Sequence, residues 1–537
     1  MLLLATIMAV ASLSAAAEPN KLTVQVDKAG VKISPTLYGL MTEEINHAYD
    51  GGLYAELIQN RAFNDTAKIG QEPDPIHPPH WRLVKSGTAS GSIILDQANP
   101  AAAALPTSLR VTLNGGSGRI GAATDGYWGI PVQHMQYQLS FFARATPELK
   151  QPLTVAIESD DGKTTYATAN VSGIGIDWKK YHAVLNVGDA TPSSKNRFVV
   201  WTPAEAKGSI WLSLVSLFPP TFNNRPNGLR ADLMELMGGL KPAFLRFPGG
   251  NYLEGNTIPE RFNWKTTIGL IEDRPGHVCP WGYRSTDGLG LLEFLTWCED
   301  LHMQPVLAVY AGYSLQQQRI AAGNDMLPLV NDALDEIEYV AGGADTGWGA
   351  RRVKDGHPEP FKLTYVEVGN EDNFDNVPGS YEQRFAQFFD AIKAKYPNLL
   401  VIATMPIRDR KPDLVDDHYY RSAVDMERDS NHYDAQDNGR AKYSRSGPKI
   451  FVGEWATTEG RPTPTLQAAL GDAAWMTGME RNSDIVSISC YAPLFVNVNR
   501  GASQWGTNLI GYDALKSYGS PSYYAQKMFS ENRGDRV

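Results

Sequence analysis

Short apolar runs alternate with amphipathic stretches over the second half of the chain, from residue 228 onward. Apolar runs of this kind predict buried parallel strands, and amphipathic stretches between them predict helices. A similar run at 36–42 precedes a stretch, Gly52 to Phe63, that we expect to be helical. The strands expected are 36–42, 243–248, 304–311, 363–369, 399–404, 413–419, 449–454 and 484–491, and the later helices are 228–240, 287–301, 325–341, 380–395 and 463–481.

This alternation predicts an α/β fold. Eight strand–helix units spread over roughly 300 residues fit a (β/α)8 TIM barrel. A doubly wound sheet is the alternative, but no glycine-rich phosphate loop follows any of the predicted strands, which counts against it.

Residues 75–220 have a different pattern, with short alternating strands, frequent turn signals and almost no helical periodicity. Many short strands at this spacing predict a β-sandwich, inserted after the first barrel strand. We therefore expect a first βα element at 36–65, a carbohydrate-binding-module-like sandwich at 75–220, a catalytic barrel at 225–495 and a segment, 496–537, that completes the barrel.

The N-terminus begins with an apolar run at 2–10, and Ala15-Ala16-Ala17 precedes Glu18. This is typical of a secretory signal peptide, here 1–17, although no Lys or Arg precedes the run. We expect a secreted or periplasmic protein whose 18–35 segment is strand-like. No other stretch approaches the roughly 20 apolar residues that cross a bilayer, so no membrane insertion is expected.

Composition narrows the possible partners. The chain has 49 basic and 59 acidic residues and a net charge of −10, which disfavours binding to nucleic acid or anionic lipid. Three cysteines are too few for a disulfide framework, and the sequence does not decide whether Cys279 and Cys298 form a disulfide bridge. No His/Cys cluster, calcium loop or dinucleotide loop is present, so we expect no metal and no organic cofactor.

Two glutamates end predicted barrel strands, where barrel enzymes place their catalytic groups. Glu371 closes Gly369-Asn370-Glu371 after the fourth strand, and Glu454 closes the seventh. A lone glutamate in such a place is more often a helix cap or a solvated charge. A pair suits glycoside hydrolysis, which needs one carboxylic acid and one carboxylate across the scissile bond. We expect repulsion between them to raise the pKa of one and hydrogen bonds to lower that of the other.

Longer motifs carry a narrower resemblance. The stretches 38–47 (YGLMTEEINH), 50–57 (DGGLYAEL), 245–252 (LRFPGGNY), 263–265 (NWK), 283–290 (YRSTDGLG) and 505–526 are similar to those of the family 51 α-L-arabinofuranosidases, clan A retaining glycosidases. The resemblance covers nearly the whole mature chain, and it is only general in the inserted sandwich.

The resemblance implies roles for matching positions. Glu371 would be the general acid/base and Glu454 the nucleophile. The residues expected to bind or surround the substrate are Glu43 (with Glu44 as its rival), Asn251, Asn370, Tyr420, Trp264 and His418, with Trp281 and Trp455 as further candidate sugar platforms. Arg246 would either pair with a catalytic carboxylate or make a structural ion pair, and Glu367 would support the site from below.

Two departures from the family pattern stand out. The family usually continues into a C-terminal β-domain, which we expect to be missing or truncated here, so that 21–34 would lack strand partners. No polar residue near the end of the eighth strand, in 490–494, would contact the sugar.

The implied activity is retaining exo-hydrolysis of terminal α-L-arabinofuranosyl groups from arabinan- or arabinoxylan-type substrates. An endo-β-1,4-glucanase or another clan A glycosidase is the alternative, and a non-catalytic polysaccharide-binding protein is the third reading.

Overall fold

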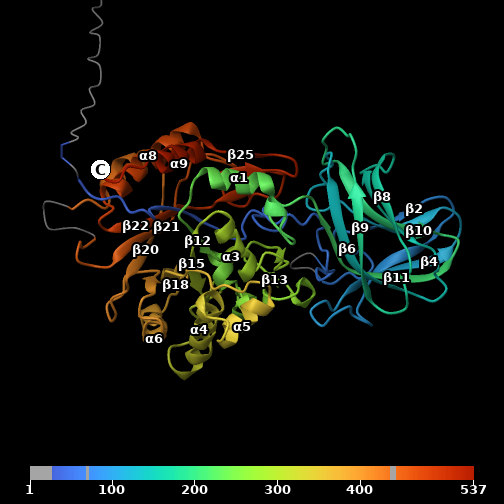
Figure 1. The fold of residues 1–537 in the computed structure, drawn as a ribbon, viewed down its shortest axis with the longest axis horizontal. Coiled ribbons are helices and arrows are strands. Elements are labelled where there is room, and N and C mark those ends of the chain that lie inside the picture. The colour runs from blue at the N-terminus through green and yellow to red at the C-terminus, as the bar shows by residue number, and fades with distance from the viewer. Residues whose placement is uncertain (1–26, 29, 68–71, 436–442) are drawn as a thin grey trace, which may run out of the picture.

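The computed structural model describes residues 27–28, 30–67, 72–435 and 443–537. The predicted signal peptide 1–17, and residues 18–26 and 29 of the strand-like segment that follows it, lie outside these residues. Two bodies lie side by side, a barrel with its helices and a smaller all-β unit (Figure 1).

Eight parallel strands close into a barrel, which confirms the predicted (β/α)8 fold. Each of the eight predicted apolar runs supplies one strand. Their order around the barrel follows the chain, and the last strand pairs with the first. The strands are β1 (Tyr38–Met41), β12 (Phe244–Phe247), β15 (Gln304–Val309), β18 (Tyr365–Val368), β19 (Leu400–Ala403), β20 (Leu414–Arg421), β21 (Lys449–Thr457) and β22 (Val486–Tyr491).

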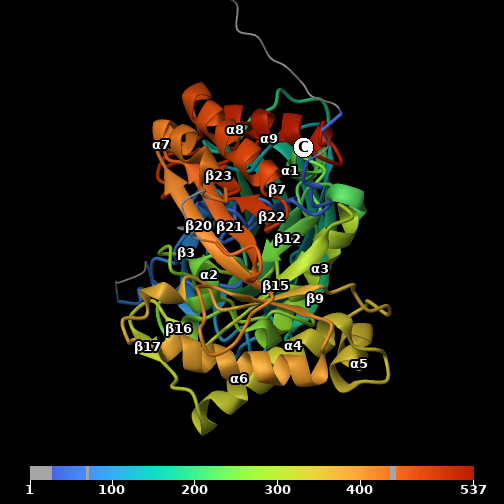
Figure 2. The ribbon, with the colours of Figure 1, turned by 90° about the vertical axis from the view of Figure 1, so that its left-hand side faces the viewer.

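Helices cover the outside of the barrel, with α8 and α9 on one side and α4 and α6 on the opposite side (Figure 2). The predicted helix 380–395 forms with those bounds, and four other predictions differ by a few residues at their ends. The α-helices are α1 (Ala231–Gly239), α2 (Asn251–Glu254), α3 (Leu291–Asp300), α4 (Leu327–Ala341), α5 (Gly347–Lys354), α6 (Ser380–Lys395), α7 (Ala423–Arg428), α8 (Leu466–Arg481) and α9 (Pro521–Glu531). The short 3-10 helices are η1 (Phe222–Asn224), η2 (Ile258–Glu260), η3 (Trp264–Thr266), η4 (Ile271–Asp273), η5 (Asn324–Met326), η6 (Asp372–Phe374) and η7 (Asp429–Asn431).

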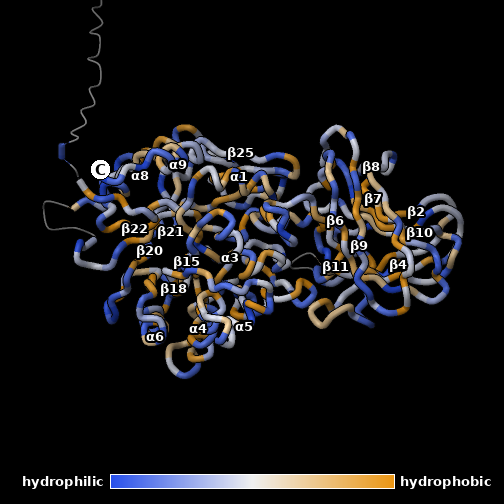
Figure 3. The backbone as a smooth tube through the Cα atoms, viewed as in Figure 1, coloured by the Kyte–Doolittle hydropathy of each residue, from blue (hydrophilic) through white to orange (hydrophobic). Residues whose placement is uncertain are grey.

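Two five-stranded antiparallel sheets form the all-β unit between β1 and β12. Inward-facing residues of both sheets, such as Val111 and Val155, share one hydrophobic core. Hydrophobic residues therefore recur along its strands between polar ones (Figure 3). One sheet holds β2 (Arg82–Lys85), β5 (Arg119–Thr124), β10 (Asn196–Pro203), β7 (Leu153–Ser159) and β8 (Thr165–Val171), and the other β3 (Ser90–Asp96), β4 (Ser108–Gly115), β11 (Lys207–Phe218), β6 (Gln136–Ala145) and β9 (Lys179–Asn186).

The junction between the two bodies contains a buried ion pair. Glu56 accepts hydrogen bonds from Arg61, at 2.8 Å, and from the hydroxyl and backbone of the last sandwich strand, at Ser216 and Leu217. Arg61 and Glu56 are at most 2% exposed. At the surface, Lys180 of the sandwich pairs with Glu272 of the barrel at 3.2 Å.

The predicted helix from Gly52 to Phe63 is wrong. This stretch consists of turns and extended chain. Its backbone is bonded to distant segments, as in Leu57 N to Leu217 O at 3.0 Å and Ala55 N to Gly228 O at 3.1 Å. Tertiary pairing has replaced the local helical pattern.

The described part of 21–34 pairs with the last residues of the chain, contrary to the expectation that this segment lacks strand partners. Within the described part of that segment, Lys32 bridges to Arg536, and Ile33 N donates to Asp535 O at 3.0 Å. Residues beyond the barrel form the three-stranded sheet β23 (Phe495–Asn497), β24 (Ile510–Tyr512) and β25 (Ser517–Gly519). Two small hairpins, β13 (His277–Val278) with β14 (Arg284–Ser285) and β16 (Tyr313–Ser314) with β17 (Gln318–Arg319), complete the strands described.

The three cysteines are buried and unpaired, which settles the open question of the Cys279–Cys298 bridge. Among the residues that the structure describes, no helix combines the length and the apolar character that crossing a membrane requires.

Candidate active site

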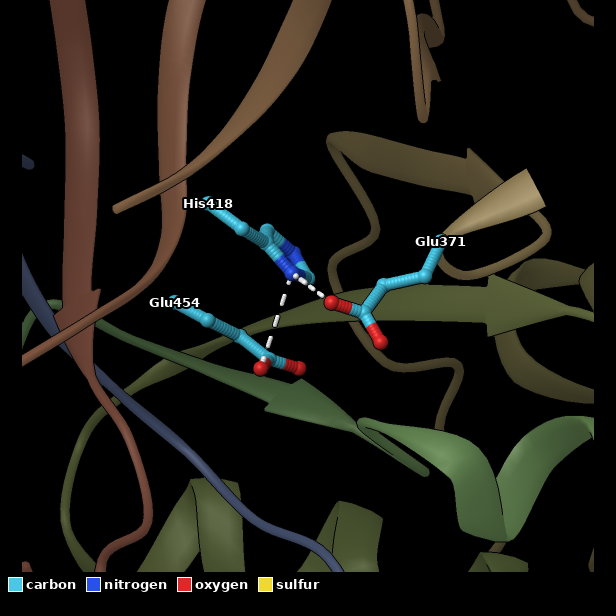
Figure 4. A group of neighbouring side chains, drawn as sticks. All are labelled: Glu371, His418 and Glu454. Atoms are coloured by element: carbon cyan, nitrogen blue, oxygen red, sulfur yellow. Dashed lines mark hydrogen bonds and ion pairs between the residues drawn. The ribbon is translucent and has the colours of Figure 1, made fainter. Parts of the chain in front are cut away.

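Two glutamates face one imidazole at the carboxyl-terminal mouth of the barrel. Glu454 lies on β21 and His418 on β20, where the parallel register pairs the two residues. Glu371 lies in the loop after β18. His418 Nδ1 is 2.9 Å from Glu371 Oε1 and 3.5 Å from Glu454 Oε2 (Figure 4).

The separation of the two carboxylates distinguishes between hydrolytic mechanisms. One oxygen of Glu371 and one of Glu454 lie within 4.8 Å of each other. A spacing of about 5–5.5 Å is typical of a pair that works by a covalent intermediate, whereas about 6.5–9.5 Å leaves room for a water molecule. The pair observed is therefore suited to double displacement.

Glu371 adopts an unusual backbone conformation, with φ 42° and ψ 38°. Residues other than glycine rarely adopt this left-handed conformation, and backbone strain of this kind concentrates at functional sites. The neighbouring Asp372 fixes the turn, because Arg384 donates to it at 2.8 Å and Thr404 donates at 3.2 Å. The loop thus holds the Glu371 side chain against His418.

Both oxygens of Glu454 accept hydrogen bonds. Arg246 Nη1 donates to Oε1 at 3.0 Å, and the Tyr420 hydroxyl donates to Oε2 at 2.7 Å. Arg246, on β12, is fully buried and also donates to Glu367 at 2.5 Å and to Asn370 at 2.8 Å. Arg246 therefore makes both of the contacts that the sequence left as alternatives, and Glu367 supports it from below.

Asp416 anchors His418 from behind, with its Oδ2 2.7 Å from Nε2. Burial raises the pKa of Asp416, but the charge and hydrogen bond of His418 outweigh it and bring this pKa to about 2. Burial lowers the pKa of His418, yet the charges of Asp416 and Glu454 raise it well above its ordinary value. The raised pKa favours a protonated His418 ring, which can donate to Glu371 from Nδ1 and to Asp416 from Nε2.

His418 changes the pKa of Glu371 in the direction opposite to that expected for the proton donor. Burial raises the pKa of Glu371, but the hydrogen bond and charge of His418 prevail, and the net pKa lies below the ordinary value. The expected rise by repulsion is therefore not seen at Glu371 in the free site, where the hydrogen bond from His418 has the larger effect.

Glu43 is nearly buried at the edge of the same site and accepts a hydrogen bond from Trp281 Nε1 at 2.8 Å. Burial, followed by the charge of Glu454, raises the pKa of Glu43 to about 8. Its rival Glu44 points elsewhere, because its Oε2 accepts from the backbone of Tyr49 at 2.7 Å. A Cβ at Gly250 would meet the Glu43 carboxylate at 2.2 Å, which explains the glycine there.

Asn370 and Asn251 converge on one buried carboxylate, that of Glu254. Asn370 Nδ2 donates to Glu254 Oε2 at 3.0 Å, and Asn251 Nδ2 donates to the same oxygen at 3.4 Å. Asn370 is fully buried and Asn251 is half-buried. The two predicted sugar-binding amides thus share a single acceptor.

Trp264 lies apart from the other predicted residues. It is 2% exposed, packs against Tyr339 and Trp348, and donates from Nε1 to the Asp332 carbonyl at 3.3 Å. The contacts place it in the helical layer outside the barrel, so its prediction as a sugar platform is wrong.

The other aromatic candidates divide. Trp455 is buried against Tyr491. Trp281 donates a hydrogen bond to Glu43, and its ring lies near that of Trp505. Trp505 is 39% exposed, and its ring also lies near that of Tyr420. Trp505 is a rim residue that sequence reasoning did not single out.

Two buried carboxylates of the site, Asp416 and Glu254, were also missed. A signal existed for Asp416, because Asp416, His418 and Tyr420 alternate along one strand and so share a face. Glu254 offered no comparable signal, since a glutamate at the end of a predicted loop is ordinarily a solvated charge.

Glu371, His418 and Glu454 also have the spacing of a metal site, with candidate ligand atoms within 4.8 Å of one another. A metal ion there would need His418 as a neutral ring, because only the neutral imidazole has a free lone pair.

A cavity of about 610 Å³ lies elsewhere, at the junction of sandwich and barrel. Its walls include Gln136, Gln138 and His182 from the sandwich and Asn224 and Arg225 from the barrel side. None of the residues discussed above for the glutamate site lines it.

Comparisons with known proteins agree over most of the chain. Residues 236–439 match the model of the "Alpha-L-arabinofuranosidase 1 domain". The chain is 37% identical to "Probable alpha-L-arabinofuranosidase A" of Aspergillus terreus, over 95% of this chain and 79% of that protein. It is 36% identical to "Alpha-L-arabinofuranosidase A" of Aspergillus kawachii, over 95% and 80% respectively. The solved structure of arabinose-bound "MgGH51 a-L-Arabinofuranosidase" superimposes with a TM-score of 0.87 at 39% identity, over 95% of this chain and 82% of that one.

A second family model corrects one expectation. Residues 453–537 match the "Alpha-L-arabinofuranosidase C-terminal domain", so a C-terminal domain is present and is not truncated. The apolar runs in this region led us to assign it only to the barrel. In the structure these residues extend from the end of β21 through the sheet β23–β24–β25 to α9, and α9 packs on α8.

Proposed function

This chain belongs to the family 51 α-L-arabinofuranosidases, and on that premise we propose that it removes terminal α-L-arabinofuranosyl groups from arabinose-containing glycans with retention of configuration. One observation supports retention above all others. One oxygen of Glu371 and one of Glu454 lie within 4.8 Å of each other, close to the separation of retaining pairs.

In the first step, a Glu454 oxygen attacks the anomeric carbon while Glu371 gives a proton to the departing glycosidic oxygen. The bond to the aglycone breaks, and an ester between Glu454 and the arabinosyl group forms. In the second step, Glu371 takes a proton from water, whose oxygen displaces Glu454. Arg246 and Tyr420 orient both Glu454 oxygens for attack.

The proton for the first step is exchanged between His418 and Glu371. In the free site the raised pKa of His418 favours the proton on the imidazole, whose Nδ1 is 2.9 Å from Glu371 Oε1. Transfer along this hydrogen bond converts Glu371 into the acid that the leaving oxygen needs. Asp416 stabilises His418 before transfer.

Recognition of the sugar hydroxyls is assigned to Glu43, Asn251 and Asn370, with Trp281 and Trp505 at the rim. Glu43 and Asn251 retain partly accessible surface beside the glutamates. Hydrogen bonds to sugar hydroxyls that strengthen as positive charge develops at the anomeric carbon contribute to catalysis.

The test is arabinose release from defined arabino-oligosaccharides and from an aryl arabinofuranoside by the parent, Glu371→Ala and Glu454→Ala. We expect Glu371→Ala to lose about 10²–10⁴-fold on oligosaccharides, to retain more activity on the aryl substrate, and to be rescued by azide. Glu454→Ala should lose nearly all turnover with both substrates. Equal, modest losses in both variants would show that the roles are assigned to the wrong groups.

The two alternatives have their own discriminating results. Activity on carboxymethyl-cellulose without release of arabinose would favour an endo-β-1,4-glucanase. Glycan binding that survives Glu371→Ala, together with no hydrolysis by the parent, would favour a non-catalytic polysaccharide-binding protein.

For the inserted sandwich, we propose that its junction cavity binds a neutral glycan chain. The charged groups of the cavity are already paired, Lys180 with Glu272 and Arg225 with Asp300, while the amides of Gln136 and Gln138 have no hydrogen-bond partner among the described residues. Affinity electrophoresis in arabinoxylan should show retardation of the parent that Gln136→Ala/Gln138→Ala reduces. Equal mobility of the two would refute glycan binding there.

Export of the protein remains a proposal that rests on the apolar run at 2–10 and the Ala15–Ala17 motif. Expression of the full chain followed by N-terminal sequencing of the product in the culture medium or periplasm tests it. We expect the mature protein to begin at Glu18.

A further inference from the structure

Glu254 has no role in the mechanism above, yet it lies fully inside the site at the end of α2. It is 2% exposed, and its Oε2 accepts hydrogen bonds from the amides of both Asn370 and Asn251. We propose that Glu254 is a positioning residue that fixes the orientation of both amides and thereby sets how the sugar hydroxyls are held. This inference rests on the proposed function.

The orientation of the Asn370 amide is determined from both ends. Its Oδ1 accepts from Arg246 Nη2 at 2.8 Å, and its Nδ2 donates to Glu254 Oε2 at 3.0 Å. A flipped amide would direct its NH2 group at a guanidinium and its oxygen at a carboxylate, which are two repulsive contacts. The Oδ1 atom and one Nδ2 hydrogen of Asn370 are thus already hydrogen-bonded, and the second Nδ2 hydrogen points in a fixed direction.

Asn251 depends on Glu254 more heavily. The contact at 3.4 Å is the only side-chain hydrogen bond of Asn251 among the described residues. Without an acceptor at position 254, the half-buried amide would rotate among several directions.

The two carboxylate oxygens of Glu254 differ in their hydrogen bonding, and this difference makes the positioning role testable. Oε2 takes both amide bonds, whereas Oε1 is buried and has no partner among the residues described. Burial, followed by the charge of Glu371, raises the pKa of Glu254 well above its ordinary value. The positioning role needs one acceptor oxygen and does not need a full negative charge.

The experiment compares Glu254→Gln with Glu254→Met, using an aryl arabinofuranoside and a defined arabino-oligosaccharide. Glutamine keeps an acceptor oxygen in the Oε2 position, so we expect kcat/KM within about threefold of the parent. Methionine has a similar shape without the acceptor, and we expect a loss of about 10²-fold, the scale of a misplaced positioning contact.

A double-mutant cycle separates positioning from general damage. In an Asn370→Ala background, Glu254→Met should cost much less than it does alone, because one of the amides it positions is absent. Melting temperatures measured in parallel report folding, and binding of L-arabinose by calorimetry reports recognition without turnover. Additive losses, or a Glu254→Met enzyme within threefold of the parent, would overturn the proposal.

A polarity exchange keeps the proposal testable if Glu254→Met does not fold. Asn370→Asp turns the donor facing Glu254 into an acceptor and should lower arabinose affinity. Adding Glu254→Gln restores a hydrogen bond to position 370 in the reverse direction, although its NH2 group no longer accepts from Asn251. Affinity should therefore recover in part, and no recovery would contradict the role. An inactive parent that still binds arabinose would refute the proposed activity and leave these binding comparisons decisive for Glu254.

Discussion

Single side chains show where charge is placed in this site and why. His418 lies between two glutamates, and Asp416 holds it from the opposite side. Three carboxylates around one imidazole stabilise its protonated form, because each contributes a nearby opposite charge. The protonation state of the site therefore depends on His418, Asp416 and the two glutamates together.

The first prediction concerns Asp416→Asn. Removing this charge takes away the largest of the influences that raise the pKa of His418. The imidazole should then lose its proton at lower pH, and the alkaline limb of a bell-shaped kcat/KM profile should move to lower pH. Rates measured across pH with an arabino-oligosaccharide check this, and an unchanged limb would mean that the proton is not held by His418.

The second prediction concerns stability and Glu43. Its pKa rises from 4.5 to about 8 on folding, so between these pH values the folded state binds a proton that the unfolded state has lost. The free energy of unfolding contributed by this group must therefore fall as pH rises through this window.

Glu43→Gln removes that titration. The melting temperature of the parent should decline more steeply than that of Glu43→Gln between pH 5 and pH 8, and Glu359→Gln, at an exposed position, should follow the parent. Parallel curves for all three proteins would contradict the assignment.

At the scale of elements, the sequence predicted strands better than the residues between them. Most barrel strands are largely apolar and buried, a pattern that depends only on local sequence, and all eight strands were found, including β20 with its polar residues. The stretch after Gly52 failed because its backbone partners, such as Leu217, lie far along the chain. Short α7 and α9 escaped notice because neither has a long apolar face.

The site residues divide by the same logic. Glu371 and Glu454 could be predicted because the ends of barrel strands meet at one mouth. Trp264 could not be placed, because nothing local distinguishes a tryptophan in the helical layer from one in a pocket. Glu254 acquires its partner Asn370 only when the loop after β18 brings that residue to α2.

The third prediction concerns Trp264, whose side chain packs η3 against α4 and α5. Its ring contacts Tyr339 and Trp348. Trp264→Ala should lower the free energy of unfolding by about 3–5 kcal/mol. The kcat/KM of the folded fraction should stay near that of the parent. Denaturant unfolding and kinetics at 25 °C check the two parts, and a selective loss of kcat/KM would return this residue to the sugar site.

For the molecule as a whole, the sandwich and the barrel are joined through a buried ion pair as well as through the chain. Glu56 follows the first barrel strand, and it accepts from Ser216 and Leu217 at the end of the sandwich. Arg61 completes the group at 2.8 Å. The two hydrophobic cores are therefore mechanically connected at this point.

The fourth prediction tests that connection. Glu56→Ala leaves Arg61 buried without its partner, and breaking such a pair costs about 3–5 kcal/mol. Calorimetry should show a lower temperature for the first unfolding transition and a wider temperature separation between the unfolding of the two cores. Glu272→Ala, which removes the exposed pair with Lys180, serves as the matched control and should change little. A single, unshifted transition in Glu56→Ala would rule out the coupling.

The barrel's first strand lies between β12 and β22 in space, with Leu40 beside both Leu245 and Tyr491, although the entire sandwich is encoded between Leu40 and Leu245. During synthesis the sandwich is complete before either neighbour of β1 has left the ribosome. At about 5–20 residues per second, the stretch from β12 to β22 takes on the order of tens of seconds. The edge of β1 that faces β22 therefore stays unpaired throughout that interval, and the barrel closes only after β22 has been synthesised.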